Sequence, residues 1–123
     1  MSEDPYRERI IQIALRLPGA EAPSRESQHL KFEVKGKTFA YYLVNHHGDG
    51  RLALATKCPP GEHQALAATE PQRFFIPPYI GPRGWVGLDM DAAPVNWDEV
   101  TALLTASYRL VAPKRLAAML SGA

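Results

Sequence analysis

The sequence predicts an α+β domain of two layers, in which an antiparallel sheet of about four to five strands carries its helices mainly on one face. Helical and strand periodicities follow one another in the order helix, three strands, helix, strand, helix. The loops between successive strands are short, which favours antiparallel pairing. Helices that are segregated from an antiparallel sheet form a second layer on it. A chain of 123 residues has the usual size of one domain, so residues 1–123 are expected to share a single core.

The first two predicted helices cover residues 5–17 and 62–69. Asp4 can cap the first, and Pro5 suits its first turn because the missing N–H of proline would be unpaired there anyway. Its apolar stripe consists of Tyr6, Ile10, Ile13, Ala14 and Leu17. The second helix follows the turn sequence Pro-Pro-Gly at 59–61 and ends before Pro71.

The third predicted helix begins after Asn96, a favourable N-cap residue, and Glu99 is placed to complete a capping box. Its apolar stripe consists of Trp97, Val100, Leu104, Tyr108 and Val111. Pro113 separates it from a short terminal helix over residues 114–120.

Four strands are predicted from alternating apolar and polar residues, at 30–35, 37–44, 51–56 and 85–90. Residues 72–82 are rich in proline and lack a helical period, so an ordered but mostly irregular segment is expected there.

Composition and charge exclude several classes of protein. Hydrophobic residues make up 46% of the chain, which is too high for a disordered protein. The formal net charge is +1, so only local clustering of cations could attract a polyanion. The single cysteine, Cys58, rules out an internal disulfide. No stretch has the ~20 apolar residues of a membrane span, and none resembles a signal peptide, so we expect a cytoplasmic protein that does not enter a membrane. The sequence leaves the oligomeric state open, with a monomer favoured.

Candidate catalytic and metal-binding residues are few. His46, His47 and Asp49 lie in one loop, but no second ligand pair has a useful spacing, so we expect a solvated loop and no metal or cofactor. Lys57 and the following helix start could lower the pKa of Cys58, but no positioned base accompanies it. We therefore expect Cys58 to pack in the structure and the protein not to be an enzyme.

One surface pattern suggests a binding site. Lys31 and Lys35 alternate with the apolar residues of the first strand, Lys37 follows across the turn, and Arg83 precedes Trp85 on the last strand. A sheet face that combines these cations with an aromatic ring could hold phosphates and stack on bases. A solvated lysine face, with Trp85 packed under the proline-rich segment, remains the alternative.

Short motifs in a consistent order and spacing complete the sequence evidence. They are Leu-Pro-Gly-Ala at 17–20, Phe-Glu-Val-Lys-Gly-Lys-Thr-Phe-Ala at 32–40, Lys-Cys-Pro at 57–59, Pro-Pro-Tyr at 77–79, Gly-Trp-Val at 84–86 and Ser-Tyr-Arg-Leu-Val-Ala-Pro-Lys-Arg-Leu at 107–116. Over nearly its whole length the chain resembles the MmcQ/YjbR-like family of small bacterial proteins.

The resemblance implies a frataxin-like, two-layer fold and a similarity to the "double wing" sheet of phage transcription factors, which contacts DNA. Iron binding through an acidic helix ridge is not expected, because Arg7, Arg9 and Arg16 lie on the first helix. We therefore expect a non-enzymatic protein that binds DNA through an exposed sheet face. The expected contacts are Lys31, Lys35, Lys37, Lys57, Arg83 and Trp85. The alternative is a module that binds a protein or a small anionic ligand in a cleft formed by Lys57, Tyr79 and Trp85.

Overall fold

The computed structural model describes residues 4–23, 25–45 and 50–121 of the chain. Within these residues the helices are α1 (Arg7–Leu15), α2 (Glu62–Thr69), the 3₁₀ turn η2 (Gly81–Arg83), α3 (Trp97–Val111) and α4 (Lys114–Ser121). The strands are β1 (Ala20–Glu21), β2 (Leu30–Val34), β3 (Lys37–Val44), β4 (Leu52–Lys57), β5 (Phe74–Phe75) and β6 (Trp85–Asp89). The six strands form one antiparallel sheet in the order β1-β2-β3-β4-β6-β5.

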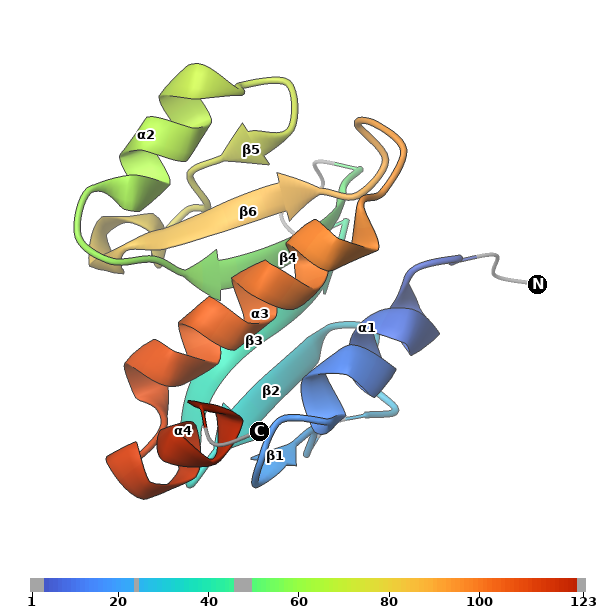
Figure 1. The fold of residues 1–123 in the computed structure, drawn as a ribbon. Coiled ribbons are helices and arrows are strands. Elements are labelled where there is room, and N and C mark those ends of the chain that lie inside the picture. Colours follow the sequence, from blue (N-terminus) through green and yellow to red (C-terminus); the bar gives the residue numbers. More distant parts are fainter. Residues whose placement is uncertain (1–3, 24, 46–49, 122–123) are drawn as a thin grey trace.

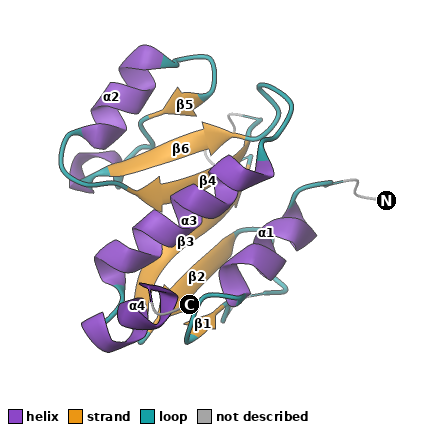
Figure 2. Ribbon diagram, in the orientation of Figure 1, coloured by secondary structure: helices purple, strands orange, loops and turns teal. Residues whose placement is uncertain are grey.

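The helices form a layer on one face of this sheet. Figure 1 shows α3 crossing in front of β3 and β4, with α1 in front of β2 and α4 at the lower end of α3. Helix α2 lies at the other side of the molecule, next to β5 and β6 (Figure 2). The predicted α+β class is confirmed, although the sheet has more strands than expected.

Side-chain caps fix the starts of the two long helices. Asp4 Oδ1 accepts hydrogen bonds from the backbone N–H groups of Tyr6 (3.0 Å) and Arg7 (3.1 Å), so it caps α1 as predicted, although the helix begins two residues later than Pro5. Asn96 accepts from the N–H groups of Asp98 and Glu99 at the start of α3. The Glu99 carboxylate, expected in a capping box, instead binds the Arg73 guanidinium at 2.6 and 3.0 Å.

The core lies between the helices and the facing side of the sheet. Val100, Leu104 and Tyr108 of α3 are fully buried, as their helical spacing predicted. The Tyr108 ring packs edge-on against Phe39 at 5.6 Å, and its hydroxyl donates to the Pro18 carbonyl at 2.6 Å. This polar contact lets a tyrosine be buried without leaving its hydroxyl unpaired.

Two short edge strands were not predicted. β1 and β5 each have two residues, which is too short for an alternating pattern to be recognised. β5 lies in the segment 72–82, which was expected to be irregular, and η2 overlaps the end of that segment. The backbone of this segment therefore extends the sheet by pairing Phe74 and Phe75 with β6.

The second face of the sheet is less open than expected. Ala55, in the middle of β4, is fully buried on this side, and Trp85 is only 7% exposed. The Phe75 ring lies over Gly87 so closely that a Cβ at this position would overlap the ring carbons. Residues 77–80 lie beside Tyr41, which also faces this side. The centre of the second face is therefore packed, and the exposed parts of the strands are their ends.

Candidate functional site

The strand connections bring cations to one end of the sheet. The β2–β3 turn holds Lys35 and Lys37, because Val34 pairs with Lys37. Lys57 ends β4 at the same end of the sheet, since Thr56 pairs with Ala40 near the start of β3. Arg83 precedes β6, whose first residue pairs with Lys57.

The C-terminal helices add more cations to this end. Ser107 of α3 is buried, accepts a hydrogen bond from the Lys57 backbone N–H at 2.8 Å and donates to the Phe39 carbonyl at 2.6 Å. This anchors the last turns of α3, with Arg109, beside the strand ends. Leu116 of α4 lies within van der Waals distance of a Cβ built on Gly19, next to Val34, so α4 also lies near the β2–β3 turn.

We call this set of seven cations the basic end. Its members come from the β2–β3 turn, β4, η2, α3 and α4, and they are Lys35, Lys37, Lys57, Arg83, Arg109, Lys114 and Arg115. All are exposed except Lys57, which is half-buried. They make up half of the fourteen lysines and arginines in a chain of net charge +1, so the rest of the molecule is acidic overall.

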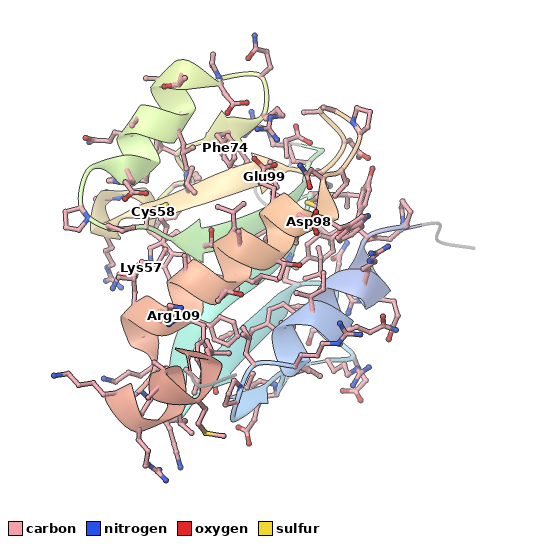
Figure 3. The ribbon with its side chains drawn as sticks, in the orientation of Figure 1. Lys57, Cys58, Phe74, Asp98, Glu99 and Arg109 are labelled. Carbon is pink, nitrogen blue, oxygen red and sulfur yellow. The ribbon has the colours of Figure 1, made fainter. Side chains whose placement is uncertain are left out.

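Carboxylates gather at the other end of α3. Figure 3 shows Lys57 and Arg109 toward one end of this helix and Asp98 and Glu99 at the other. Among the described residues, no carboxylate forms an ion pair with Lys35, Lys37, Lys57 or Arg83. The charge separation along the helix therefore leaves cations at the basic end available to an external anion.

Two predicted DNA contacts are not part of the basic end. Lys31 is the second residue of β2, toward the end of the strand that is remote from the β2–β3 turn, and it pairs with Glu33 at 3.1 Å. Trp85 is buried, and its ring packs on Tyr41 with 5.3 Å between ring centroids. This is the arrangement of the packing alternative, and it leaves little of the indole ring for stacking on a base.

The predicted cleft of Lys57, Tyr79 and Trp85 does not form as one site. Tyr79 is 81% exposed and lines an apolar groove with Tyr41 and residues 77–80. Lys57 lines a different hollow. The error came from placing Tyr79 by its closeness to Trp85 in the sequence, whereas the intervening η2 turn separates the two regions.

The hollow at Lys57, which we call the α2 cleft, lies at the N-terminus of α2. Its volume is about 470 Å³, which is in the size range of small-molecule sites. Its lining residues are Lys57, Cys58, Pro59, Pro60, Gly61, His63, Pro82, Arg83, Gly84 and Leu110. The cleft is thus walled by prolines and Leu110 and carries two of the cations of the basic end.

Glycines and a backbone hydrogen bond shape this cleft. The Cys58 N–H donates to the Gly84 carbonyl at 2.8 Å, which ties the Lys57 strand end to the Arg83 turn. Gly84 has a φ of +94°, and a Cβ there would lie 3.3 Å from the Cys58 carbonyl oxygen. Gly61, the N-cap of α2, has a φ of +86°. Residues with a Cβ would be strained at both positions.

Two chemically distinctive side chains line the cleft. Cys58 is buried, as expected of a packing residue, and burial, with a smaller effect from the charge of Glu62, raises the pKa of its thiol. His63, which the sequence left as an isolated residue, is only 7% exposed. Its Nδ1 is the one buried side-chain nitrogen or oxygen in the described part of the chain without a hydrogen-bond partner.

Other predicted features are outside the site or outside the described residues. His46, His47 and Asp49 belong to the part of the chain that the structure does not describe. Elsewhere, in residues 4–23, 25–45 and 50–121, no three His, Cys, Asp or Glu side chains are grouped as metal ligands would be. Nor do these residues contain a helix with the length and apolar character of a membrane span.

The chain matches a known protein family. The model of the YjbR family matches residues 15–110, a stretch that includes the strands of the basic end and the α2 cleft. The chain belongs to the YjbR family. No curated protein matches it.

Among solved structures, the chain is similar to the Deinococcus radiodurans protein DR2400, a member of the domain family DUF419. The TM-score is 0.69 at 22% sequence identity, and the match covers 93% of this chain and 86% of the other. At this sequence identity the similarity shows a shared fold. The shared fold extends over nearly the whole chain.

Proposed function

We propose that this YjbR protein is a non-enzymatic DNA-binding protein that contacts backbone phosphates through its basic end. The observation that carries the proposal is the convergence of seven cations from five separate elements on one end of a nearly neutral molecule. Phosphate contacts by lysine and arginine supply most of the affinity of non-specific DNA binding. The surface differs from the sheet face that the resemblance implied, because that face is packed in its centre.

The aromatic rings near the basic end favour duplex over single-stranded DNA. Phe39 and Tyr108 are fully buried, and Trp85 is nearly so. Stacking on unpaired bases needs an exposed ring. Lysine and arginine contacts to phosphates carry no base-sequence information by themselves. The proposed binding is therefore to the duplex backbone, with weak dependence on sequence.

The state of the Cys58 thiol supports a binding role over a catalytic one. A raised thiol pKa keeps Cys58 protonated near neutral pH, so it is a poor nucleophile. Six of the seven cations of the basic end belong to exposed side chains, which can reach a large anion without rearrangement of the core, and Lys57 is half-buried.

The test is a fluorescence-anisotropy titration of a labelled duplex at several salt concentrations. We expect a Kd on the order of 10⁻⁴–10⁻⁶ M at physiological salt, and a slope of log affinity against log salt of about −0.9 per phosphate contact. Replacing Lys35 and Lys37 together by alanine removes up to two phosphate contacts, because both side chains are exposed at one turn. The slope should therefore become less negative by up to about 1.8.

A matched control removes the same charge from the opposite end. Arg9 and Arg25 are exposed and lie near the N-terminal half of α1 and the segment before β2. The variant R9A/R25A should keep the slope of the unmodified protein, whereas K35A/K37A should not. If both variants flattened the salt slope equally, a localised binding site would be refuted. A folded protein that binds no duplex at about 50 mM salt would refute DNA binding.

A further inference from the structure

The α2 cleft has features of a built anion site. Lys57 and Arg83 bring two positive charges to it from different elements. The cleft also meets the N-terminus of α2, an eight-residue helix whose N-cap is glycine. The Pro59 carbonyl accepts from the Glu62 N–H at 3.0 Å, but Gly61 has no side chain to cap the N–H groups that follow, and the helix dipole places partial positive charge there. Three independent sources of positive potential therefore converge on one hollow.

His63 supplies a separate observation that points to a ligand. The ring belongs to the first turn of α2, lines the cleft and is more than nine-tenths buried. A buried nitrogen without a partner costs free energy unless a bound group satisfies it. Because His63 lines the cleft, a polar group of a bound ligand is the natural partner for this nitrogen.

The size and walls of the cleft limit the class of ligand. A volume of about 470 Å³ exceeds what a free inorganic anion would fill. Pro59, Pro60 and Leu110 give apolar contact area beside the cations. A ligand that uses both parts has a compact anionic group and a larger body with an apolar surface.

We propose that the α2 cleft binds a phosphate monoester that carries a nucleoside, with the phosphate between Lys57, Arg83 and the N-terminus of α2. Two cations and a helix N-terminus match a dianionic phosphate better than a monoanionic carboxylate. The same chemistry has two sources, the terminal phosphate of a nucleic-acid strand and a free nucleotide. The first source rests on the proposed DNA binding, and the second does not.

Calorimetric titration with adenosine 5′-monophosphate, adenosine and acetate tests the ligand class. The monophosphate should bind, while adenosine and acetate should bind at least about tenfold more weakly. R83Q changes an exposed side chain and should weaken binding of the monophosphate by about tenfold to a hundredfold, which is the range for one charge-assisted hydrogen bond. R25Q, at the other end of the sheet, should leave the affinity for the monophosphate unchanged.

Two further variants test the geometry. H63F should weaken binding while retaining an aromatic ring in the same place, and a thermal melt shows whether that variant is folded. E62Q removes the acidic side chain in the first turn of α2 and should tighten binding, since Glu62 repels an anion at that position. The proposal is overturned if the monophosphate does not bind. It is also overturned if R83Q does not weaken binding, even where H63F is unfolded.

Two short duplexes, one with 5′-phosphates and one with 5′-hydroxyls, distinguish the sources. Tighter binding of the phosphorylated duplex assigns the cleft to strand ends. Equal binding of the two, with the monophosphate still bound, assigns it to free nucleotides. If neither duplex binds but the monophosphate does, the proposed DNA-binding function fails and the cleft assignment stands.

Discussion

Removal of one hydroxyl, that of Ser107, should destabilise the whole domain. Its Oγ is fully buried and joins three elements, since it accepts from the Lys57 N–H of β4 and donates to the Phe39 carbonyl of β3. Ser107→Ala leaves both backbone groups buried without this partner. An unsatisfied buried group costs about 1–3 kcal/mol, so we expect a loss of roughly 2–4 kcal/mol in the free energy of unfolding.

This loss is large enough for two assays. An unfolding entropy of about 2.1 cal/mol/K per residue means that 1 kcal/mol shifts the Tm of such a chain by about 4 °C. Urea melts should show a lower midpoint with an unchanged slope. Thr101→Ala on the same helix is the control, because its exposed hydroxyl donates only to the Trp97 carbonyl at 2.8 Å. A Ser107→Ala loss as small as that of the control, below about 0.5 kcal/mol, would refute the role of Ser107 as a link between the helix and the sheet.

Two other predictions concern tyrosines. Tyr108→Ala should cost about 3–5 kcal/mol because the ring is fully buried, while Tyr108→Phe should cost about 1–3 kcal/mol by leaving the Pro18 carbonyl unpaired. Urea melts that rank the two variants equally would contradict this. The hydrogen bond from the Tyr6 hydroxyl to Asp91 is the main cause that raises the pKa of Tyr6 to about 12. The unfolded chain loses this proton near pH 10 and the folded one near pH 12, so stability should fall as pH rises through that window, and Tyr6→Phe should reduce the fall. Urea melts at pH 9 and pH 11 measure this fall in stability. An equal fall in the unmodified protein and in Tyr6→Phe would be inconsistent with the hydrogen bond to Asp91.

Most of the helices and the longer strands could be predicted because their patterns are local. Asn96 and the spacing of Val100, Leu104 and Tyr108 determine where α3 starts and which side it buries. β1 and β5 could not be predicted, since two residues carry no period and their pairing depends on neighbours brought in by the fold. The packed second face was missed for a similar reason, because Phe75 covers Gly87 only through tertiary contact.

The candidate site was predicted only in part. Lys35, Lys37, Lys57 and Arg83 do lie together, but at the end of the sheet and not on its face. Cations from α3 and α4 join them through the Ser107 contacts, which no local pattern reveals. His63 has no motif around it, and its unpaired nitrogen can be recognised only from its burial.

The central claim, that the basic end is the DNA-binding surface, can be tested by following backbone amide resonances during titration with a short duplex. Amides at the β2–β3 turn, at Lys57 and at Arg83 should shift together, and the shifts should vanish as salt is raised. Amides near Asp91 and Asn96, at the opposite end of the molecule, should stay unchanged. The account is contradicted if the salt-sensitive shifts map instead to Tyr79 and Tyr41 in the apolar groove, or are spread evenly over both ends of the sheet.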